Sequence, residues 1–330
     1  GGGGMGNGYG AGAPPGGGKL VHSALRVPRV SSSETVLTAN CRRVFANAHT
    51  YHINSISINS DCETFISADD LRVNLWNLEV PNQSFNIVDI KPSNMEDLTE
   101  VITAADFHPS QCNLFAYSSS KGTIRLADMR SAALCNAHAK QFEEQEPPGN
   151  RSFFSEIIAS ISDIKFASSG RYVLSRDYLT LKLWDINMER EPVATMRVHE
   201  HVRTKLCDVY ENDSIFDKFE CCLSGDGRHV ATGSYSNLFR VFQAGGEGEV
   251  SLEASKNPQR KVAQSPKASS RLSLTRGRSS SQKRLQDAAA DPAAGPQDFT
   301  AKLLHLAWHP EQDALAVAAS NSLYIFSALQ

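Results

Sequence analysis

The chain has 330 residues, of which 41% are hydrophobic and 21% are charged, values that are ordinary for a globular protein with a hydrophobic core. Its net charge of −3 conceals a basic stretch, residues 254–286, which holds nine Lys and Arg and no acid, so the remainder carries −12 (−3 minus 9). No apolar run approaches the roughly 18 residues that span a bilayer, no signal segment opens the chain, and the seven cysteines form no CxxC pair. We therefore expect a reduced, intracellular protein that is cytoplasmic, with the nucleus as a second compartment.

Residues 1–18 are glycine with a few Ala, Pro and polar residues. Such a segment cannot bury enough apolar surface to offset its chain entropy, so residues 1–40 predict a disordered N-terminal segment. The run from Arg42 to Ala46 that follows has the pattern of an outer strand.

From residue 41 onward the sequence repeats. Five segments, which begin at Ile53, Ile102, Ile161, Phe219 and Leu303, each predict a strand, a polar turn, a second strand, a small-residue turn and a third strand. In every repeat the first-strand anchor and the last-strand aromatic position lie 18 to 20 residues apart, as from Ile58 to Trp76 and from Phe166 to Trp184. Constant repeats joined by variable connections are typical of stacked four-stranded blades.

The predicted fold is therefore all-β, a WD-repeat β-propeller, with a β-sandwich as the less favoured alternative. The third repeat ends in Trp184-Asp185, the dipeptide that marks WD repeats. We assign residues 41–243 to repeats one to four and residues 301–330 to the last repeat. Two short helical turns, Met95 to Glu100 and Phe153 to Ser160, are expected before the second and third repeats.

Residues 244–300 separate the fourth repeat from the fifth, and their core is Ser, Arg, Lys, Pro and Gln. This composition predicts a disordered insertion whose serines can be phosphorylated. Binding of nucleic acid or of an acidic membrane is the alternative, but residues 254–286 contain no aromatic residue for base stacking. We expect neither nucleic acid nor membrane as a partner.

Several runs go beyond a generic WD repeat, among them RVFANAH, SADDLRVNLWNLE, MEDLTEVITAADFHP, NRSFFSEIIASISDIKF, YENDSIFDKFECC and LLHLAWHP. Together they resemble the B-type, fifty-five-kilodalton-class regulatory subunit of protein phosphatase type 2A. The resemblance implies a propeller of seven blades, of which five repeats are visible here. It also implies association with a scaffold subunit and a catalytic subunit, and selection of phosphoprotein substrates. Members of the family carry about two further blades before the RRVFA run, so ring closure and scaffold binding are open for this chain.

The sequence gives little support for catalysis. It contains no GxSxG elbow, P-loop or HExxH motif, and we expect no enzymatic activity, no cofactor and no metal. His49 and His52 point to opposite faces of an extended chain, so we interpret them as loop or core residues. Cys221 and Cys222 are expected to be buried thiols in an inner strand.

Acidic residues recur in the predicted connections, where Asp69, Asp70 and Asp177 occupy matching turns. Carboxylates gathered at one face of a propeller would attract partners rich in Lys and Arg. In the resembled family this face forms an acidic substrate groove. By motif position, six residues match its substrate contacts: Asp70, Glu96, Leu98, Tyr210, Asp213 and Phe216.

The predicted function is therefore regulation of a type 2A Ser/Thr phosphatase and docking of its basic phosphoprotein substrates. Two alternatives remain open at this point. One is a generic WD-repeat scaffold or adaptor in another complex, such as a ubiquitin ligase. The other is a truncated variant that does not assemble.

Overall fold

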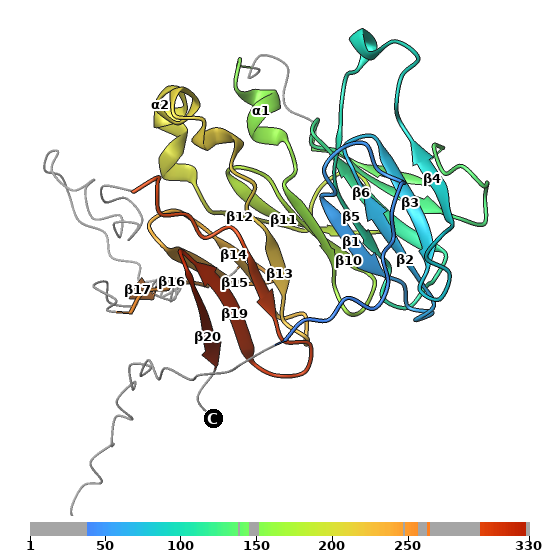
Figure 1. Ribbon diagram of the computed structural model, residues 1–330. Helices are drawn as coiled ribbons and strands as arrows, with labels where there is room; N and C mark the ends of the chain where they lie inside the picture. Colours follow the sequence, from blue (N-terminus) through green and yellow to red (C-terminus); the bar gives the residue numbers. More distant parts are fainter. Residues whose placement is uncertain are drawn as a thin grey trace, which may run out of the picture. The chain divides into compact units, whose positions relative to one another are not determined.

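The structure is a computed structural model that describes residues 38–137, 139–144, 152–246, 248–256, 263–264 and 298–327. Most of the expected disordered segments, 1–40 and 244–300, lie outside the described residues. The described chain forms five antiparallel sheets in which strands pair in chain order (Figure 1).

The first three sheets have four strands each. The first sheet contains β1 (Ser55–Ile58), β2 (Thr64–Ala68), β3 (Arg72–Asn77) and β4 (Ser84–Asp89). The second contains β5 (Ile102–Phe107), β6 (Leu114–Ser119), β7 (Ile124–Asp128) and β8 (Lys140–Phe142). The third contains β9 (Asp163–Phe166), β10 (Tyr172–Arg176), β11 (Thr180–Asp185) and β12 (Ala194–Arg197).

The last two sheets depart from four strands. The fourth contains β13 (Cys221–Leu223), β14 (His229–Gly233), β15 (Leu238–Gln243), β16 (Glu249–Glu253) and β17 (Ala263–Gln264). The fifth contains β18 (Leu306–Trp308), β19 (Ala314–Ala319) and β20 (Ser322–Ser327), so the final repeat supplies three inner strands, as expected. Because β16 and β17 fall within 244–300, part of the expected insertion is sheet.

Successive sheets meet through their first strands. β1 contacts β5, β5 contacts β9, β9 contacts β13 and β13 contacts β18. Apolar side chains from neighbouring sheets fill the space between them, as where Ile66 and Val73 pack with Phe107 and Phe115. Each such side chain, fully buried, contributes about 1.5–3 kcal/mol to folding. This serial stacking of small meandering sheets confirms the predicted WD-repeat propeller class.

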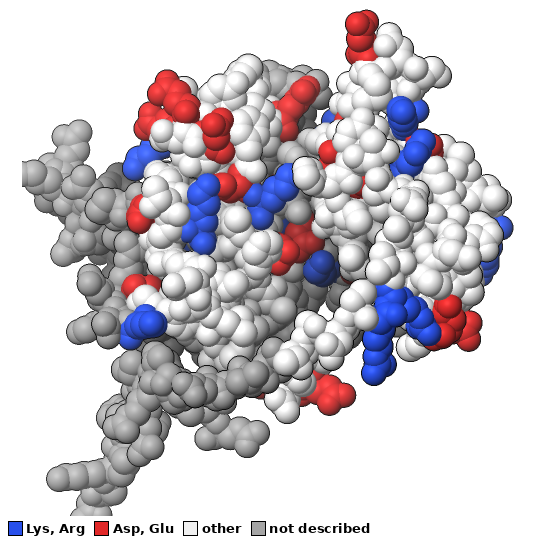
Figure 2. Space-filling view, in the orientation of Figure 1, with Lys and Arg blue, Asp and Glu red and all other residues white. Residues whose placement is uncertain are grey.

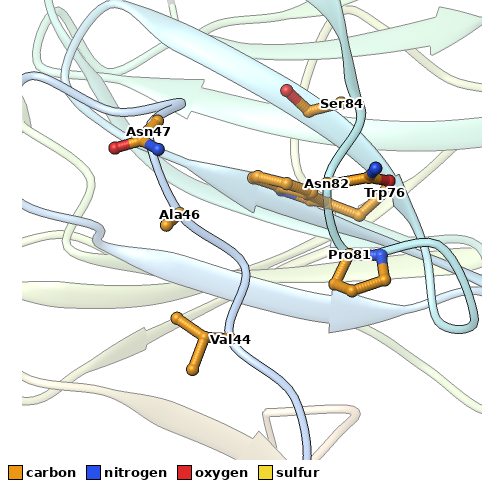
Figure 3. A pocket seen from close by; sticks show the side chains of 7 residues that line it. All are labelled: Val44, Ala46, Asn47, Trp76, Pro81, Asn82 and Ser84. Atoms are coloured by element: carbon orange, nitrogen blue, oxygen red, sulfur yellow. The ribbon is translucent and has the colours of Figure 1, made fainter.

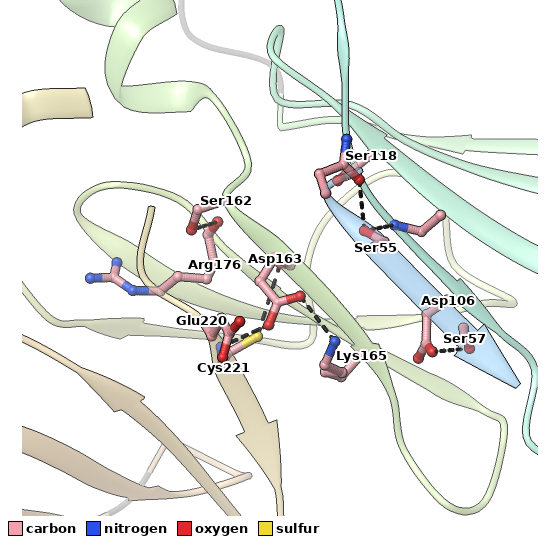
Figure 4. Close-up of polar contacts among 12 residues, drawn as sticks. Ser55, Ser57, Asp106, Ser118, Ser162, Asp163, Lys165, Arg176, Glu220 and Cys221 are labelled. Carbon is pink, nitrogen blue, oxygen red and sulfur yellow. Dashed lines mark hydrogen bonds and ion pairs between the residues drawn. The ribbon is translucent and has the colours of Figure 1, made fainter. Parts of the chain in front are cut away.

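Polar side chains also join the first strands of neighbouring sheets (Figure 4). Asp106 Oδ1 accepts a hydrogen bond from Ser57 Oγ at 2.7 Å, and its Oδ2 accepts one from the Phe166 amide at 2.9 Å. Asp163 repeats this arrangement and accepts from the Cys221 amide at 2.9 Å. In the second and third sheets one carboxylate of the first strand therefore satisfies a backbone donor of the next sheet, which helps to fix the register between these sheets.

A chain of side-chain hydrogen bonds explains the aromatic residue at the end of β3. Trp76 Nε1 donates to Ser67 Oγ at 2.8 Å, Ser67 Oγ lies 2.6 Å from His49 Nε2, and His49 Nδ1 lies 2.8 Å from Asp69 Oδ2. The third sheet keeps the Trp184–Ser175 part of this arrangement, at 2.9 Å. His49 is thus a loop residue whose side chain, 8% exposed, is held in this network, in line with its interpretation as a loop or core residue.

The predicted outer strand at Arg42 to Ala46 is wrong, because residues 41–46 form no strand. The ring of Phe45 instead packs edge-on against Phe65 and Trp76, with centroids 4.9 and 5.5 Å apart. The segment is therefore attached to the first sheet by ring packing and not by strand pairing.

Short helices interrupt the connections. Both expected helical turns are present, as η1 (Met95–Asp97) and α1 (Ser155–Ala159). The sequence did not predict η2 (Glu200–Lys205), α2 (Leu206–Glu211) and η3 (Ser214–Phe216), which lie between β12 and β13. We call residues 200–216 the helical insertion.

Candidate functional site

All six predicted site residues lie in connections that leave the same end of their sheets. Antiparallel strands alternate in direction, so the turn from second to third strand and the crossing to the next sheet emerge at one end. Asp70 lies in the β2–β3 turn, Glu96 and Leu98 lie in or beside η1, and the other three lie in the helical insertion. Figure 1 shows α1, α2 and the β4–β5 loop projecting from the same side of the sheets.

The helical insertion rests on a hydrophobic cluster of its own. Val202, Val209 and Ile215 are buried from the insertion side, against Tyr178 and Tyr235 from the turns of the third and fourth sheets. The helices are one or two turns long, so they derive their stability from this packing rather than from helix propensity. The cluster leaves the opposite side of the insertion facing solvent.

Four aromatic rings meet beside this cluster, and we call Phe153, Phe154, Tyr210 and Phe216 the aromatic platform. Phe154 is partly buried and packs against the cluster, whereas the other three are exposed. Tyr210 is its centre, with ring centroids 5.5 Å from Phe153, 5.8 Å from Phe154 and 5.9 Å from Phe216. Phe153 is 70% exposed and Phe216 is 53% exposed. Large aromatic side chains left open to water in one cluster are typical of an interaction site.

Phe153 and Phe154 were not among the predicted site residues. They belong to the connection between β8 and β9, whereas Tyr210 lies between β12 and β13. The paired phenylalanines just before α1 were the only available signal, and nothing in their spacing shows that they reach Tyr210.

Acidic side chains accompany the aromatic platform. Asp208, Glu211 and Asp213 are exposed in the helical insertion, where residues 206–217 contain no Lys or Arg. Glu96 and Asp97 are exposed in η1. Figure 2 shows acidic groups over α2 and at the tip of the β4–β5 loop, with some basic side chains on the surface between them. This edge of the molecule therefore offers carboxylates at the points that project furthest.

The six predicted residues do not all touch. Tyr210 and Phe216 are in ring contact, and Asp213 lies between them in sequence with a left-handed φ of 58°. Asp70 lies in a turn of the first sheet, and Glu96 and Leu98 lie in the connection from the first sheet to the second, while the helical insertion joins the third sheet to the fourth. The Asp70 carbonyl accepts from the Ile102 amide at 2.8 Å, which fixes its turn against the next sheet. The site would thus be an extended face rather than a pocket.

The neighbouring acids Asp69 and Asp177 are not part of this face, contrary to the expectation from their matching turns. Asp69 is 1% exposed and accepts from the amides of Leu71 and Arg72 at 2.8 and 2.7 Å. Asp177 is buried in the same way and accepts from the Leu179 amide at 2.9 Å. These carboxylates close the turns between strands, and their hydrogen bonds leave them unavailable to a partner.

A cavity of about 350 Å³ lies at the opposite end of the first sheet (Figure 3). Its lining is neutral and consists of Val44, Ala46, Asn47, Trp76, Pro81, Asn82 and Ser84. With no titratable side chain, this lining offers no general acid or base for a reaction.

The described residues also hold no group of three or more His, Cys, Asp or Glu placed to bind a metal, and none of their helices is long and apolar enough to cross a membrane. Cys221 and Cys222 are buried, as expected, and burial raises the pKa of the Cys222 thiol to about 12. Such a thiol stays protonated and unreactive at neutral pH.

Comparison with known proteins agrees with the predicted family. Residues 39–77 match the family described as WD domain, G-beta repeat. The chain is 65% identical over 96% of its length to the B beta isoform of the serine/threonine protein phosphatase 2A 55 kDa regulatory subunit of Arabidopsis thaliana. It is 60% identical over 92% of its length to the protein phosphatase PP2A 55 kDa regulatory subunit of Drosophila melanogaster. These identities confirm the predicted resemblance, and both names describe regulatory rather than catalytic subunits.

The chain spans 62% of the Arabidopsis protein and 59% of the Drosophila protein. Among solved structures, it resembles the crystal structure of Chaetomium thermophilum Raptor with a TM-score of 0.50 and 15% identity, over 81% of this chain and 19% of that one. At this identity the similarity concerns the fold alone.

Proposed function

Because the chain is a relative of the 55 kDa regulatory subunits of protein phosphatase 2A along 96% of its length, we propose that it is itself a regulatory subunit of a type 2A Ser/Thr phosphatase. In this role it binds phosphoprotein substrates and presents them to a separate catalytic subunit. Its partners are that catalytic subunit and a scaffold subunit, and it works in the cytoplasm and the nucleus. Neither nucleic acid nor a membrane is required for this activity.

The observation that carries the proposal is the coincidence of aromatic and acidic side chains at one end of the sheets. The exposed rings of Tyr210 and Phe216 supply apolar area for an anchor residue of the substrate. Asp70, Glu96 and Asp213 supply negative charge that favours Lys and Arg beside the phosphorylated residue. Leu98, half-buried beside η1, extends the apolar part of the surface.

The phosphate itself needs a different site. A dianionic phosphoryl group is repelled by the carboxylates of this face, so the basic flank of the substrate docks here while the phosphate projects away. Docking of the basic flank at this face, with the phosphate held elsewhere, fits a protein that binds substrates while a separate catalytic subunit hydrolyses the phosphoester.

A generic WD-repeat adaptor is the other candidate function, and the high identity along nearly the whole chain argues against it. A chain that cannot assemble with the scaffold and catalytic subunits is a separate possibility, and the following experiment distinguishes it from a regulatory subunit.

The test is co-purification followed by substrate binding. The tagged 330-residue chain is mixed with purified scaffold and catalytic subunits, and the complex is separated by size exclusion. We expect a ternary complex that removes phosphate from a Lys/Arg-rich phosphopeptide faster than the scaffold–catalytic pair does. A chain that binds the peptide but neither subunit would refute the regulatory role, and one that binds both subunits but no peptide would refute substrate docking.

A further inference from the structure

The hydroxyl of one buried tyrosine joins the helical insertion to the sheets beneath it. Tyr235 lies in the β14–β15 turn and is 0% exposed. Its Oη lies 3.0 Å from Tyr178 Oη, 2.8 Å from the Ser214 carbonyl oxygen and 3.0 Å from Asp217 Oδ2. The three contacts come from the third sheet, from η3 and from the residue that ends η3.

The direction of these hydrogen bonds follows from the donors available. A phenol donates one hydrogen, and both Ser214 O and Asp217 Oδ2 can only accept. Tyr178 therefore donates to Tyr235, and the hydrogen of Tyr235 is shared between the two acceptors at the insertion. Burial raises the pKa of Tyr178 to about 12 and raises that of Tyr235 as well, so both phenols remain donors at neutral pH.

A second anchor reaches the same carboxylate from the approach to the last sheet. Lys302 Nζ pairs with Asp217 Oδ1 at 2.6 Å, and both side chains are more than half buried. The ring of Phe299 packs edge-on against Tyr235 with a centroid distance of 4.8 Å. Tyr235 and Asp217 thus connect the third, fourth and fifth sheets to the end of the helical insertion.

The aromatic platform depends on where this insertion ends. Ser214 and Ile215 are buried, while Phe216, the next residue, is exposed and contacts Tyr210. Because η3 is only one turn long, its own hydrogen bonds cannot hold it in place. The anchor at Ser214 and Asp217 therefore sets the direction in which the Phe216 ring faces solvent.

We infer that Tyr235 is a positioning residue for the aromatic platform: its hydroxyl holds η3 so that Phe216 and Tyr210 present their rings to a substrate. This inference rests on the proposed function of that platform. Tyr235 itself touches no substrate, since it is fully buried.

The experiment compares Tyr235→Phe with Tyr117→Phe in the full-length chain. Tyr117 is a matched control, because it is 1% exposed in β6 of the second sheet, away from the helical insertion. Tyr178→Phe is a milder variant that removes one bond of the network and keeps the hydrogen bonds to the insertion. Two quantities are measured: hydrogen exchange of the amides of residues 206–216, and the Kd of a Lys/Arg-rich peptide carrying one phosphoserine.

We expect Tyr235→Phe to speed exchange in residues 206–216 about tenfold and to raise the Kd about fivefold, since two buried acceptors lose their donor. Tyr178→Phe should have a smaller effect in the same direction. Tyr117→Phe should leave both quantities unchanged even if it lowers the melting temperature. A Tyr235→Phe protein that melts earlier but keeps wild-type exchange and Kd would overturn the inference.

The exchange measurement separates the two proposals. If wild-type protein does not bind the peptide while Tyr235→Phe still loosens residues 206–216, the anchor is real and the proposed function fails. If wild-type protein binds and Tyr235→Phe changes neither quantity, the positioning role fails and the proposed function stands.

Discussion

Replacing Phe216 by Ala removes a large part of the exposed aromatic surface around Tyr210 at little cost to folding. A phenylalanine side chain can bury about 200 Å², and because Phe216 is 53% exposed, about 100 Å² remains for a partner to cover. At about 25 cal/mol per Å² complete coverage would contribute about 2.5 kcal/mol. Interfaces cover their anchors incompletely, so we expect a loss of about 1–2 kcal/mol, equal to a roughly five- to thirtyfold higher Kd.

The matched control is Phe85→Ala, because Phe85 is 58% exposed in β4, outside the candidate site. Both variants are titrated into a fluorescently labelled Lys/Arg-rich phosphopeptide and followed by anisotropy, at a temperature where circular dichroism shows each to be folded. Phe216→Ala should weaken binding and Phe85→Ala should not. Equal Kd values for wild type and Phe216→Ala, or equal losses in the two variants, would refute the assignment of the aromatic platform as a binding surface.

Three further outcomes are expected. Asp70→Lys should raise the Kd of the same peptide roughly five- to 150-fold, equal to about 1–3 kcal/mol, because it places like charges together. Asp313 is exposed at the opposite end of the last sheet, so Asp313→Lys should change the Kd less than about twofold in the same titration. Ser67→Ala should lower the free energy of urea unfolding by about 2–4 kcal/mol, because the Ser67 hydroxyl hydrogen-bonds both Trp76 and His49. Ser175→Ala breaks only the hydrogen bond to Trp184 and should lower it about half as much. Equal losses in the two variants would contradict a stabilising role for the hydrogen bond between Ser67 and His49. His199 is fully buried, and this burial, together with a neighbouring arginine, holds its pKa well below 6.5. Its contribution to stability is therefore complete above pH 6.5 and falls as the pH drops below that value, by at most about 1.4 kcal/mol per pH unit. Thermal melts between about pH 5 and 7.5 should show a flatter dependence of melting temperature on pH for His199→Gln than for wild type, and parallel dependences would count against this role.

The sequence alone determined the repeated part of the fold. Apolar alternation and fixed spacing depend on local chain geometry, because side chains alternate every two residues along a strand and turns need particular residues. The same local logic located the inner strands, both one-turn helices before the second and third sheets, and the connection in which each candidate residue lies. It misplaced Arg42 to Ala46, where the apolar run Val44 to Ala46 suggests a strand but the ring of Phe45 instead packs on Phe65 and Trp76 of the first sheet.

What the tertiary structure decided were the contacts between residues far apart in the chain. Asp69 and Asp70 are adjacent and chemically alike, yet one closes a turn in the core and the other remains partly exposed, because only the folded chain brings His49 beside Asp69. The meeting of Phe153 with Tyr210, and of Lys302 with Asp217, likewise follows from how the sheets stack. Periodicity describes a segment and its neighbours, whereas a surface or a buried network is assembled from separate segments, so its composition is fixed only when those segments pack together.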